Sequence, residues 1–260
     1  MMLYPEEAII LAGGMGTRLQ SVVSEVPKPM APVAGKPFLE YLFPMLKQVG
    51  VKRVVLSVGH KWEVIQAHFG ANFMGIEVDY AVESTPLGTG GGIKLAFEKT
   101  TSQHVLVLNG DTLFLHDLML HWEMHQMWNE GALISLALKE MRDFDRYGTV
   151  EIYKNERVKA FREKQPKESG LINAGVYVID RELWNLVDVP EKFSFEKDVL
   201  ERYVRKLRFM GYKHEGYFID IGIPEDYDKV NRDLVNFDWT IPEAHAQMDE
   251  ITFEDGEIPY

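Results

Sequence analysis

The 260-residue chain contains no cysteine, which excludes both a disulfide framework and a thiolate-ligated zinc site. Because an absence of cysteine suits a reducing compartment, we expect a cytoplasmic protein. Long hydrophobic runs are also missing. The longest apolar stretches, 8–12 and 131–138, are far shorter than the roughly 20 residues of a membrane-spanning helix. The acidic N-terminus lacks the basic start of a signal peptide, so we expect neither an anchor nor a membrane partner.

Positive charge is scarce, since 28 Lys and Arg face 40 Asp and Glu and leave a net charge of −12. Nucleic acids and anionic membrane surfaces require a basic face, so the composition argues against both as partners. A small anionic substrate remains compatible with this composition if cations gather locally. The length and a hydrophobic content of 46% are sufficient for one large domain with a substantial core.

The first half alternates β-rich runs with helical patterns, which is typical of βαβ units around a parallel sheet. We expect strands at 8–12, 53–58, 76–82 and 105–108, and helices at 38–49, 62–69, 90–98 and 118–128. From residue 132 onward the expected strands lie closer together, at 133–138, 149–153, 158–163, 171–179, 208–212 and 216–219, with helices at 195–205 and 225–237. The sequence predicts an α/β fold whose mixed, mainly parallel, Rossmann-like central sheet is flanked by helices.

We expect one domain over 1–237, with two halves that meet near residue 130. Residues 238–260 form an acidic tail without Lys or Arg. Such a segment is either disordered or docked on the body, and apolar residues such as Trp239 and Phe253 favour docking.

Three glycines follow the first expected strand in the stretch IILAGGMGTRLQ, residues 9–20. Glycine allows backbone amides to approach a ligand closely, and a following helix directs its positive end at the same place. These features predict an anion-binding loop. The Gly-Lys-Ser/Thr ending of a P-loop is absent, and the glycine spacing differs from that of the dinucleotide fingerprint. The segment VPKPMAPVAGKPF at 26–38 adds Lys28, which lies between two prolines that keep the backbone extended.

The glycine loop and the Pro-Lys-Pro segment together resemble the signature of the sugar-phosphate nucleotidylyltransferases, which join a nucleoside triphosphate to a sugar 1-phosphate. Five further segments resemble this family in the family's order: ESTPLGTGGGIK (83–94) its base-recognition segment, VLNGDT (107–112) a metal-binding strand end, FREK (161–164) and LINAGVYVI (171–179) sugar-site strands, and FIDIGIPEDY (218–227) a second metal-ligand motif. The resemblance implies a GT-A-like nucleotide-diphospho-sugar transferase fold, with a nucleotide-binding first half and a sugar-phosphate second half.

Within this family, PLGTGGGIK, MRDFDRYGTV, GLINAGVYV and EKFSFEKDVL are similar to the guanylyltransferases of D-glycero-D-manno-heptose 1-phosphate. The resemblance implies that GMP passes from GTP to the heptose 1-phosphate, giving GDP-heptose and pyrophosphate by in-line attack on the α-phosphate. A heptose product would point to lipopolysaccharide or surface polysaccharide assembly. The family also makes a homodimer plausible.

Bringing two polyanions together requires local positive charge. We expect the loop amides of 13–17 and the guanidinium of Arg18 to hold the leaving pyrophosphate. Lys28 would lie near the α-phosphate, and Lys164 would orient the sugar phosphate. No general base is needed, because a phosphate monoester is already deprotonated near neutral pH.

Asp111 and Asp220 each follow a β-rich run, at the end where open α/β sheets place their ligands. Two carboxylates without a neighbouring His or Cys suit a hard, oxygen-preferring cation. We therefore expect these two residues to hold Mg²⁺, with Asp111 counted among the catalytic residues beside Arg18, Lys28 and Lys164.

The resemblance also implies two sets of binding residues. The expected nucleotide-binding set is Leu11, Ala12, Gly13, Gly14, Gly16, Thr17, Glu83, Pro86, Gly88 and Thr89. The expected sugar-phosphate set is Gly148, Glu163, Lys164 and Asn173. The acceptor-only carboxylate of Glu83 could accept the N–H groups of guanine, where related thymidylyltransferases typically have a glutamine, and this favours GTP.

Several alternatives stay open at this point. Within the family they are a mannose-1-phosphate guanylyltransferase and a glucose-1-phosphate thymidylyl- or cytidylyltransferase. Outside it they are a regulatory paralogue that binds a nucleotide sugar and an NAD-binding oxidoreductase. His121 and His125 lie four residues apart on an expected helix, and without a third ligand in view we interpret them as a surface feature of that helix.

Overall fold

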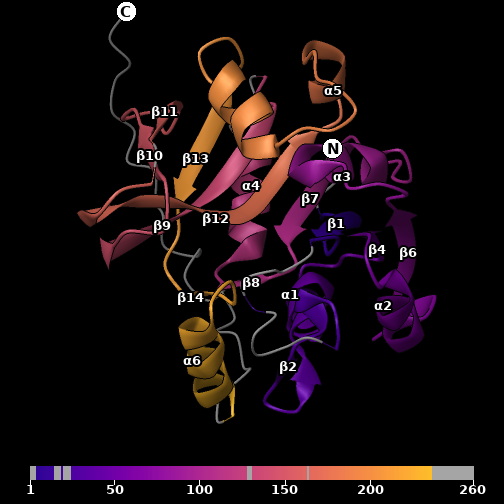
Figure 1. The fold of residues 1–260 in the computed structure, drawn as a ribbon. Helices are drawn as coiled ribbons and strands as arrows, with labels where there is room; N and C mark the ends of the chain where they lie inside the picture. Colours follow the sequence, from indigo (N-terminus) through magenta and orange to yellow (C-terminus); the bar gives the residue numbers. More distant parts are fainter. Residues whose placement is uncertain (1–3, 15–18, 20–24, 128–130, 163, 236–260) are drawn as a thin grey trace, which may run out of the picture.

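The fold is built on a mixed ten-stranded sheet in a computed structural model that describes residues 4–14, 19, 25–127, 131–162 and 164–235 (Figure 1). Four neighbouring strands form its parallel centre, in the order β7 (His104–Asn109), β1 (Glu7–Leu11), β4 (Arg53–Val58) and β6 (Ile76–Val82). The short β5 (Asn72–Phe73) pairs antiparallel with β6 at one edge. The predicted strands 53–58 and 76–82 are confirmed with the same bounds.

The long strand β12 (Lys167–Asp180) joins this centre to the rest of the sheet, because it pairs antiparallel with both β7 and β9 (Ile134–Phe144). The outer strands are β10 (Thr149–Ile152), β11 (Val158–Arg162) and β13 (Phe209–Lys213), the last parallel to β9. Two separate ribbons complete the strands: β2 (Pro32–Val33) with β3 (Lys36–Pro37), and β8 (Thr112–Leu115) with β14 (Tyr217–Asp220). The sequence did not predict β2, β3 or β5, which have only two residues each, or β8, which only two residues separate from β7.

Helices cover both faces of the sheet, as the predicted α/β class requires. Along β1, Ile10 faces one hydrophobic cluster and Ile9 faces the other, because strand side chains alternate between faces. The cluster of Ile10 includes residues of α1 (Leu42–Gln48), α2 (Trp62–Phe69), α4 (Leu118–Met127) and α6 (Pro224–Leu234). The cluster of Ile9 includes residues of α3 (Gly88–Phe97), α5 (Leu183–Leu186) and the π-helix η3 (Phe195–Glu201). None of the helices in the described residues is long and apolar enough to cross a membrane.

Two predicted helices differ from the structure in type. The predicted helix 38–49 begins with the 3₁₀ turn η2 (Phe38–Tyr41), preceded along the chain by another, η1 (Lys28–Met30), and only Leu42–Gln48 is α-helical. The predicted helix 195–205 is mainly a π-helix.

The interpretation of His121 and His125 as surface residues was wrong, because both side chains are fully buried. Helix α4 turns this face inward against β9 and the core, while Leu120 and Met127 on the same helix are exposed. The predicted acidic tail at 238–260 lies outside the described residues.

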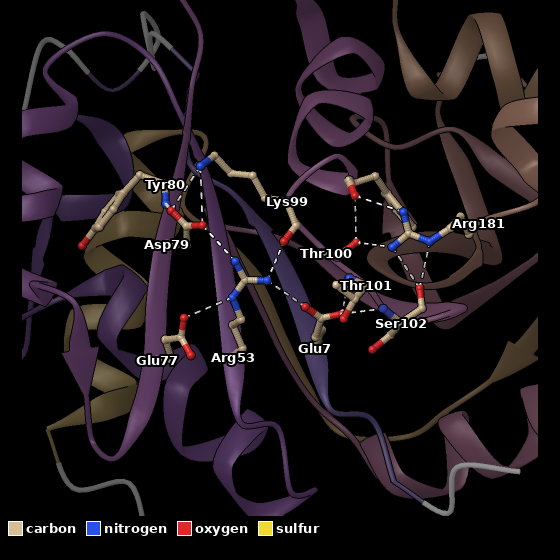
Figure 2. Close-up of polar contacts among 11 residues, drawn as sticks. Glu7, Arg53, Glu77, Asp79, Tyr80, Lys99, Thr100, Thr101, Ser102 and Arg181 are labelled. Atoms are coloured by element: carbon tan, nitrogen blue, oxygen red, sulfur yellow. Dashed lines mark hydrogen bonds and ion pairs between the residues drawn. The ribbon is translucent and has the colours of Figure 1, made fainter.

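A network of charged side chains fixes the amino ends of the central strands (Figure 2). Glu7, at the start of β1, accepts hydrogen bonds from Arg53 at 2.9 Å and from the amide of Ser102 at 2.6 Å. Arg53 also pairs with Asp79 of β6 at 2.9 Å, and Arg181 after β12 donates to the carbonyl of Ser102 at 3.0 Å. This network fixes the side of the sheet at which the central strands begin. The ligand site is at the opposite side, where the carboxyl ends of these strands lie.

Replacing Glu7 by alanine is expected to destabilise the protein by about 3 kcal/mol, because it leaves the Arg53 guanidinium and two amides without their buried partner. The backbone amide of Ser102 contributes most to lowering the pKa of Glu7 below its usual 4.5, against the opposing effect of burial. A lowered folded-state pKa stabilises the fold above pH 4.5, and this contribution is lost as the pH falls through the folded-state pKa.

Urea unfolding between pH 7 and pH 3 measures the Glu7→Ala effect, and we expect the difference from wild type to shrink below pH 4.5. The matched control is Glu77→Ala, since Glu77 pairs with the same Arg53 but is 66% exposed. That control should change stability by no more than about 1 kcal/mol. Equal losses in the two variants would contradict the assigned role of Glu7.

Candidate active site

The strand order places a ligand crevice beside β1. Successive strands β1, β4 and β6 follow one another in one direction, whereas β7 lies on the other side of β1. Open α/β sheets bind ligands at the carboxyl ends of strands where the order reverses in this way. Residues that follow β1, β6 and β7 therefore meet at this edge, and they include Gly13, Glu83 and Asp111.

The backbone at the end of β1 approaches its neighbours so closely that a side chain would not fit. A Cβ at Gly13 would lie 2.9 Å from Oε1 of Glu83 and 3.4 Å from the amide nitrogen of Gly59. Ala12 is buried, and its amide donates to the carbonyl of Ser57 at 2.8 Å, which fixes the start of the loop. The loop therefore presents bare backbone next to Glu83.

A cavity of about 300 Å³ opens at this edge. It brings together seven of the predicted nucleotide-binding residues: Leu11, Gly13, Gly14, Glu83, Pro86, Gly88 and Thr89. Lys28 and Asp111 line the same cavity, together with Pro29 and Asn109, which the sequence analysis missed. Their positions next to Lys28 and at the end of VLN in VLNGDT were the available signals.

Glu83 is held in place by contacts on both oxygens. Its Oε2 accepts the amide of Leu87 at 2.8 Å, while Oε1 lies against Gly13 and would contact a Cβ at Gly92. Burial raises the pKa of Glu83, and the hydrogen bond from the Leu87 amide is the strongest influence that opposes the rise. Since each carboxylate oxygen has two lone pairs, Glu83 retains acceptor capacity for a ligand in the cavity.

The start of α3 is also tightly packed. Gly88 has φ +76°, and a Cβ there would lie 2.5 Å from the carbonyl oxygen of Phe193. Thr89 donates its hydroxyl to Glu196 at 2.7 Å and accepts the amide of Phe195 at 2.9 Å. Its hydroxyl thus connects α3 to the π-helix while the residue also lines the cavity.

Lys28, Asp111 and Asp220 form a charged cluster at the cavity. Nζ of Lys28 lies 2.6 Å from Oδ2 of Asp111 and 3.6 Å from Oδ1 of Asp220, and the lysine side chain is only 10% exposed. The ribbon β8–β14 sets this geometry, because Asp111 precedes β8, Asp220 ends β14, and the amide of Ile221 donates to the carbonyl of Asp111 at 3.0 Å.

The two carboxylates fit a divalent cation. Oδ1 of Asp220 is buried and has no hydrogen-bond partner among the described residues. Burial raises the pKa of Asp220, and the nearby carboxylate of Asp111 raises it further, whereas Lys28 is the strongest opposing influence. An orphaned carboxylate oxygen beside a second carboxylate is suited to an ion such as Mg²⁺, which prefers oxygen ligands.

The predicted sugar-phosphate residues have different structural roles. Asn173 uses its side chain within β12, donating to the hydroxyl of Tyr177 at 2.8 Å and accepting the amide of Gly175 at 3.1 Å, at a point where the strand register shifts. A Cβ at Gly148 would lie 2.6 Å from the carbonyl oxygen of Arg162, so this glycine permits close strand contact. Lys164 is exposed just after β11.

Four predicted site residues lie outside the described part of the chain: Gly16, Thr17, Arg18 and Glu163. Arg146 is a cation of the second half that lies near the charged cluster. It pairs with Asp226 of α6, and it is close enough to Asp220 to oppose the rise in that residue's pKa. The ring of Tyr147 packs edge-on against Phe218 of β14, at a centroid distance of 5.9 Å.

Residues 7–236 match the family model described as nucleotidyl transferase. The chain belongs to this family. It is 50% identical to a D-glycero-alpha-D-manno-heptose 1-phosphate guanylyltransferase of Aneurinibacillus thermoaerophilus, over 89% of this chain and 99% of that protein. It is 47% identical to the enzyme of the same name from Campylobacter jejuni subsp. jejuni serotype O:2, over 85% of this chain and 96% of that one.

A similar fold occurs in the crystal structure of HddC from Yersinia pseudotuberculosis complexed with GMP-PN. That structure has a TM-score of 0.74 and 37% identity, and the alignment covers 88% of this chain and 98% of HddC. The predicted family and the predicted α/β fold of this nucleotidyl transferase are therefore confirmed.

Proposed function

We propose that this protein transfers GMP from GTP to D-glycero-α-D-manno-heptose 1-phosphate, giving GDP-heptose and pyrophosphate. The observation that carries the proposal is one cavity lined by the backbone glycines of the β1 loop, the acceptor-only carboxylate of Glu83, and Lys28 beside Asp111. Support comes from relatives with this named activity that match over almost their whole length.

In the proposed reaction, a phosphate oxygen of the sugar 1-phosphate attacks the α-phosphorus of GTP. A new P–O bond forms as the bond from the α-phosphorus to the bridging oxygen breaks, and the electron pair leaves with pyrophosphate. Lys28 places a positive charge next to the phosphates. The backbone amides of Gly13 and Gly14, which belong to the described part of the loop, donate hydrogen bonds to the phosphates. Arg18 and Lys164 remain proposed partners of the pyrophosphate and of the sugar phosphate. Gly148, Glu163 and Asn173 remain proposed contacts of the sugar.

We assign Asp111 and Asp220 as ligands of a divalent cation, with Mg²⁺ the ion whose chemistry suits two carboxylates. When bound there, such an ion supplies positive charge to the phosphate oxygens that gain negative charge. Because the pKa of Asp220 is raised, nearby cations are needed to keep its carboxyl group ionised. Acidic pH should therefore weaken binding of the ion at this site.

Pyrophosphate release tests the proposal directly. GTP, dTTP, UTP and CTP are each combined with the heptose 1-phosphate, mannose 1-phosphate and glucose 1-phosphate in the presence of Mg²⁺. We expect the highest kcat/KM for GTP with the heptose phosphate. Preference for mannose 1-phosphate would retain the reaction and overturn the sugar assignment. An absence of release in every combination would favour a regulatory protein that binds a nucleotide sugar.

The Glu83→Gln variant tests base recognition. An amide nitrogen in place of a carboxylate oxygen turns an acceptor into a donor, which would face the N–H donors of guanine. We expect kcat/KM for GTP to fall about 10- to 100-fold, as for the loss of one buried polar pairing, and the preference for GTP over dTTP to narrow. Glu98→Gln, at the exposed end of α3, is the matched control. An unchanged ratio of GTP to dTTP activity would remove Glu83 from base recognition.

A further inference from the structure

Three buried histidines meet outside the cavity. His116 directly follows Leu115, the last residue of β8. His121 is on α4, and His214 directly follows β13. Their side chains are 7%, 0% and 6% exposed, and a ring nitrogen of each lies within 4.8 Å of a ring nitrogen of the others. We call these three residues the histidine cluster.

The spacing inside the histidine cluster matches metal coordination. Nδ1 of His121 lies 3.1 Å from Nε2 of His214. Two nitrogens bound to one tetrahedral zinc ion at about 2.0–2.1 Å are about 3.3 Å apart. The rings of His116 and His214 have centroids 4.8 Å apart, and those of His121 and His214 are 5.1 Å apart. A small inward or outward adjustment of side chains would therefore suffice for all three rings to share one ion.

The orientation of His116 gives an independent indication. Its Nδ1 lies 3.0 Å from the carbonyl oxygen of Phe114, so this nitrogen carries the proton, and Nε2 is left with a lone pair. Nε2 is buried and has no hydrogen-bond partner among the described residues. Metal-binding histidines are typically fixed in this manner, with one ring N–H donated to a backbone carbonyl and the other nitrogen free to bind the ion.

A neighbouring pair of histidines shows what an ordinary buried arrangement looks like in this protein. His125 has a partner on each nitrogen, with Nδ1 2.6 Å from the hydroxyl of Ser135 and Nε2 3.0 Å from Nδ1 of His104. His125 thus satisfies its hydrogen-bonding groups without an ion. The histidine cluster differs because no donor among the described residues forms a hydrogen bond with the Nε2 lone pair of His116.

We propose that His116, His121 and His214 bind a single transition-metal ion of the zinc class. Imidazole nitrogens suit Zn²⁺ better than Mg²⁺, so this site and the carboxylate pair of Asp111 and Asp220 select different ions. Burial, reinforced for His116 and His121 by neighbouring histidines, lowers the pKa values of all three, to about 3 for His116 and about 4 for His214. The rings are therefore neutral at physiological pH, as metal ligation requires.

An ion at the histidine cluster would connect three segments of the chain near the β8–β14 ribbon. His116 follows β8, and His214 precedes Gly216 and the start of β14, so the cluster lies at one end of the β8–β14 ribbon. Asp111 and Asp220 lie at the other end, where Asp220 is paired with Thr112, the residue next to Asp111. The ion would thus fix this ribbon to α4, and its role is structural support of the ribbon.

Metal content and thermal stability test the proposal without reference to activity. The purified full-length protein is stripped with a chelator, reloaded with Zn²⁺ or Co²⁺, passed through gel filtration and analysed by elemental mass spectrometry. We expect about one ion per chain and the visible absorption bands of tetrahedral Co²⁺. Reloading should raise Tm by about 5–10 °C at a free metal concentration near 100 times Kd.

Variants separate the histidine cluster from general effects of histidine burial. His121→Gln and His214→Gln should each lose the bound ion and the Tm response to Zn²⁺. His125→Gln is the matched control, because His125 is equally buried on the same helix and should keep the ion. Far-UV circular dichroism at 20 °C and the cobalt spectrum are recorded for each variant, so that a loss of metal binding is distinguished from a loss of folding.

Two results would overturn the proposal. One is wild-type protein that retains less than a tenth of an equivalent of metal after reloading and shows no tetrahedral cobalt spectrum. The other is equal metal loss in His125→Gln and His214→Gln while both remain folded. Either result would make the histidine cluster a neutral part of the hydrophobic core.

Discussion

An Asp111→Asn variant is expected to lose activity by about 10³- to 10⁴-fold in kcat, the effect of weakening cation binding at the transferred phosphate. The amide keeps the shape of the side chain but removes its charge. Asp220 would then lose its neighbouring carboxylate, and the part of its raised pKa caused by Asp111 would disappear. We therefore expect the folded structure to persist, with Tm unchanged or slightly raised.

Pyrophosphate release at saturating GTP and heptose 1-phosphate measures the effect of Asp111→Asn, and Tm measured beside it reports folding. Asp228→Asn on the exposed face of α6 is the matched control and should retain full activity. Activity within tenfold of wild type in Asp111→Asn would show that this carboxylate does not hold the ion.

A Lys28→Met variant is expected to lower kcat/KM by about 10²- to 10³-fold, since a positioned cation at the phosphates acts mainly on the transition state. The variant also leaves Asp111 and Asp220 together without the ammonium group that lies 2.6 Å and 3.6 Å from their oxygens. Without metal, like-charge repulsion should therefore lower Tm, and added Mg²⁺ should raise Tm more in the variant than in wild type.

Kinetics and thermal unfolding at several Mg²⁺ concentrations measure both effects of Lys28→Met. Lys28→Arg keeps the charge and should recover part of the activity, while Lys36→Met, at a 60% exposed lysine, serves as the control. If Mg²⁺ raised the Tm of Lys28→Met no more than that of wild type, Lys28 and the ion would not neutralise the same two carboxylates.

Strong sequence patterns predicted the centre of the fold, and the resemblance to the sugar-phosphate nucleotidylyltransferases predicted most of the residues of the cavity. Alternating or continuous apolar residues defined β4 and β6 to the residue, and helical spacing did the same for α2 at Trp62–Phe69. Once parallel strands are assigned, their carboxyl ends must lie at one edge, and this brings Gly13, Glu83 and Asp111 to one cavity.

Contacts set by tertiary structure could not be predicted in the same way. The histidine cluster joins residues up to 98 positions apart, 116 to 214, and the helical spacing of His121 and His125 suggested a different pairing. Strand β8 escaped notice because only Gly110 and Asp111 separate it from β7. The inward hydrogen bond of Asn173 depends on an irregularity of β12 that no local pattern announces.

The pairing of β12 with β7 has a consequence for the synthesis of the protein. Until residues 176–180 have left the ribosome, the residues of β7 from Val105 to Leu108 have no partner on that side. An apolar, unpaired strand edge is a template for association with other chains. The N-terminal half therefore emerges in an aggregation-prone form, and it is protected only when a segment about 70 residues further along the chain arrives.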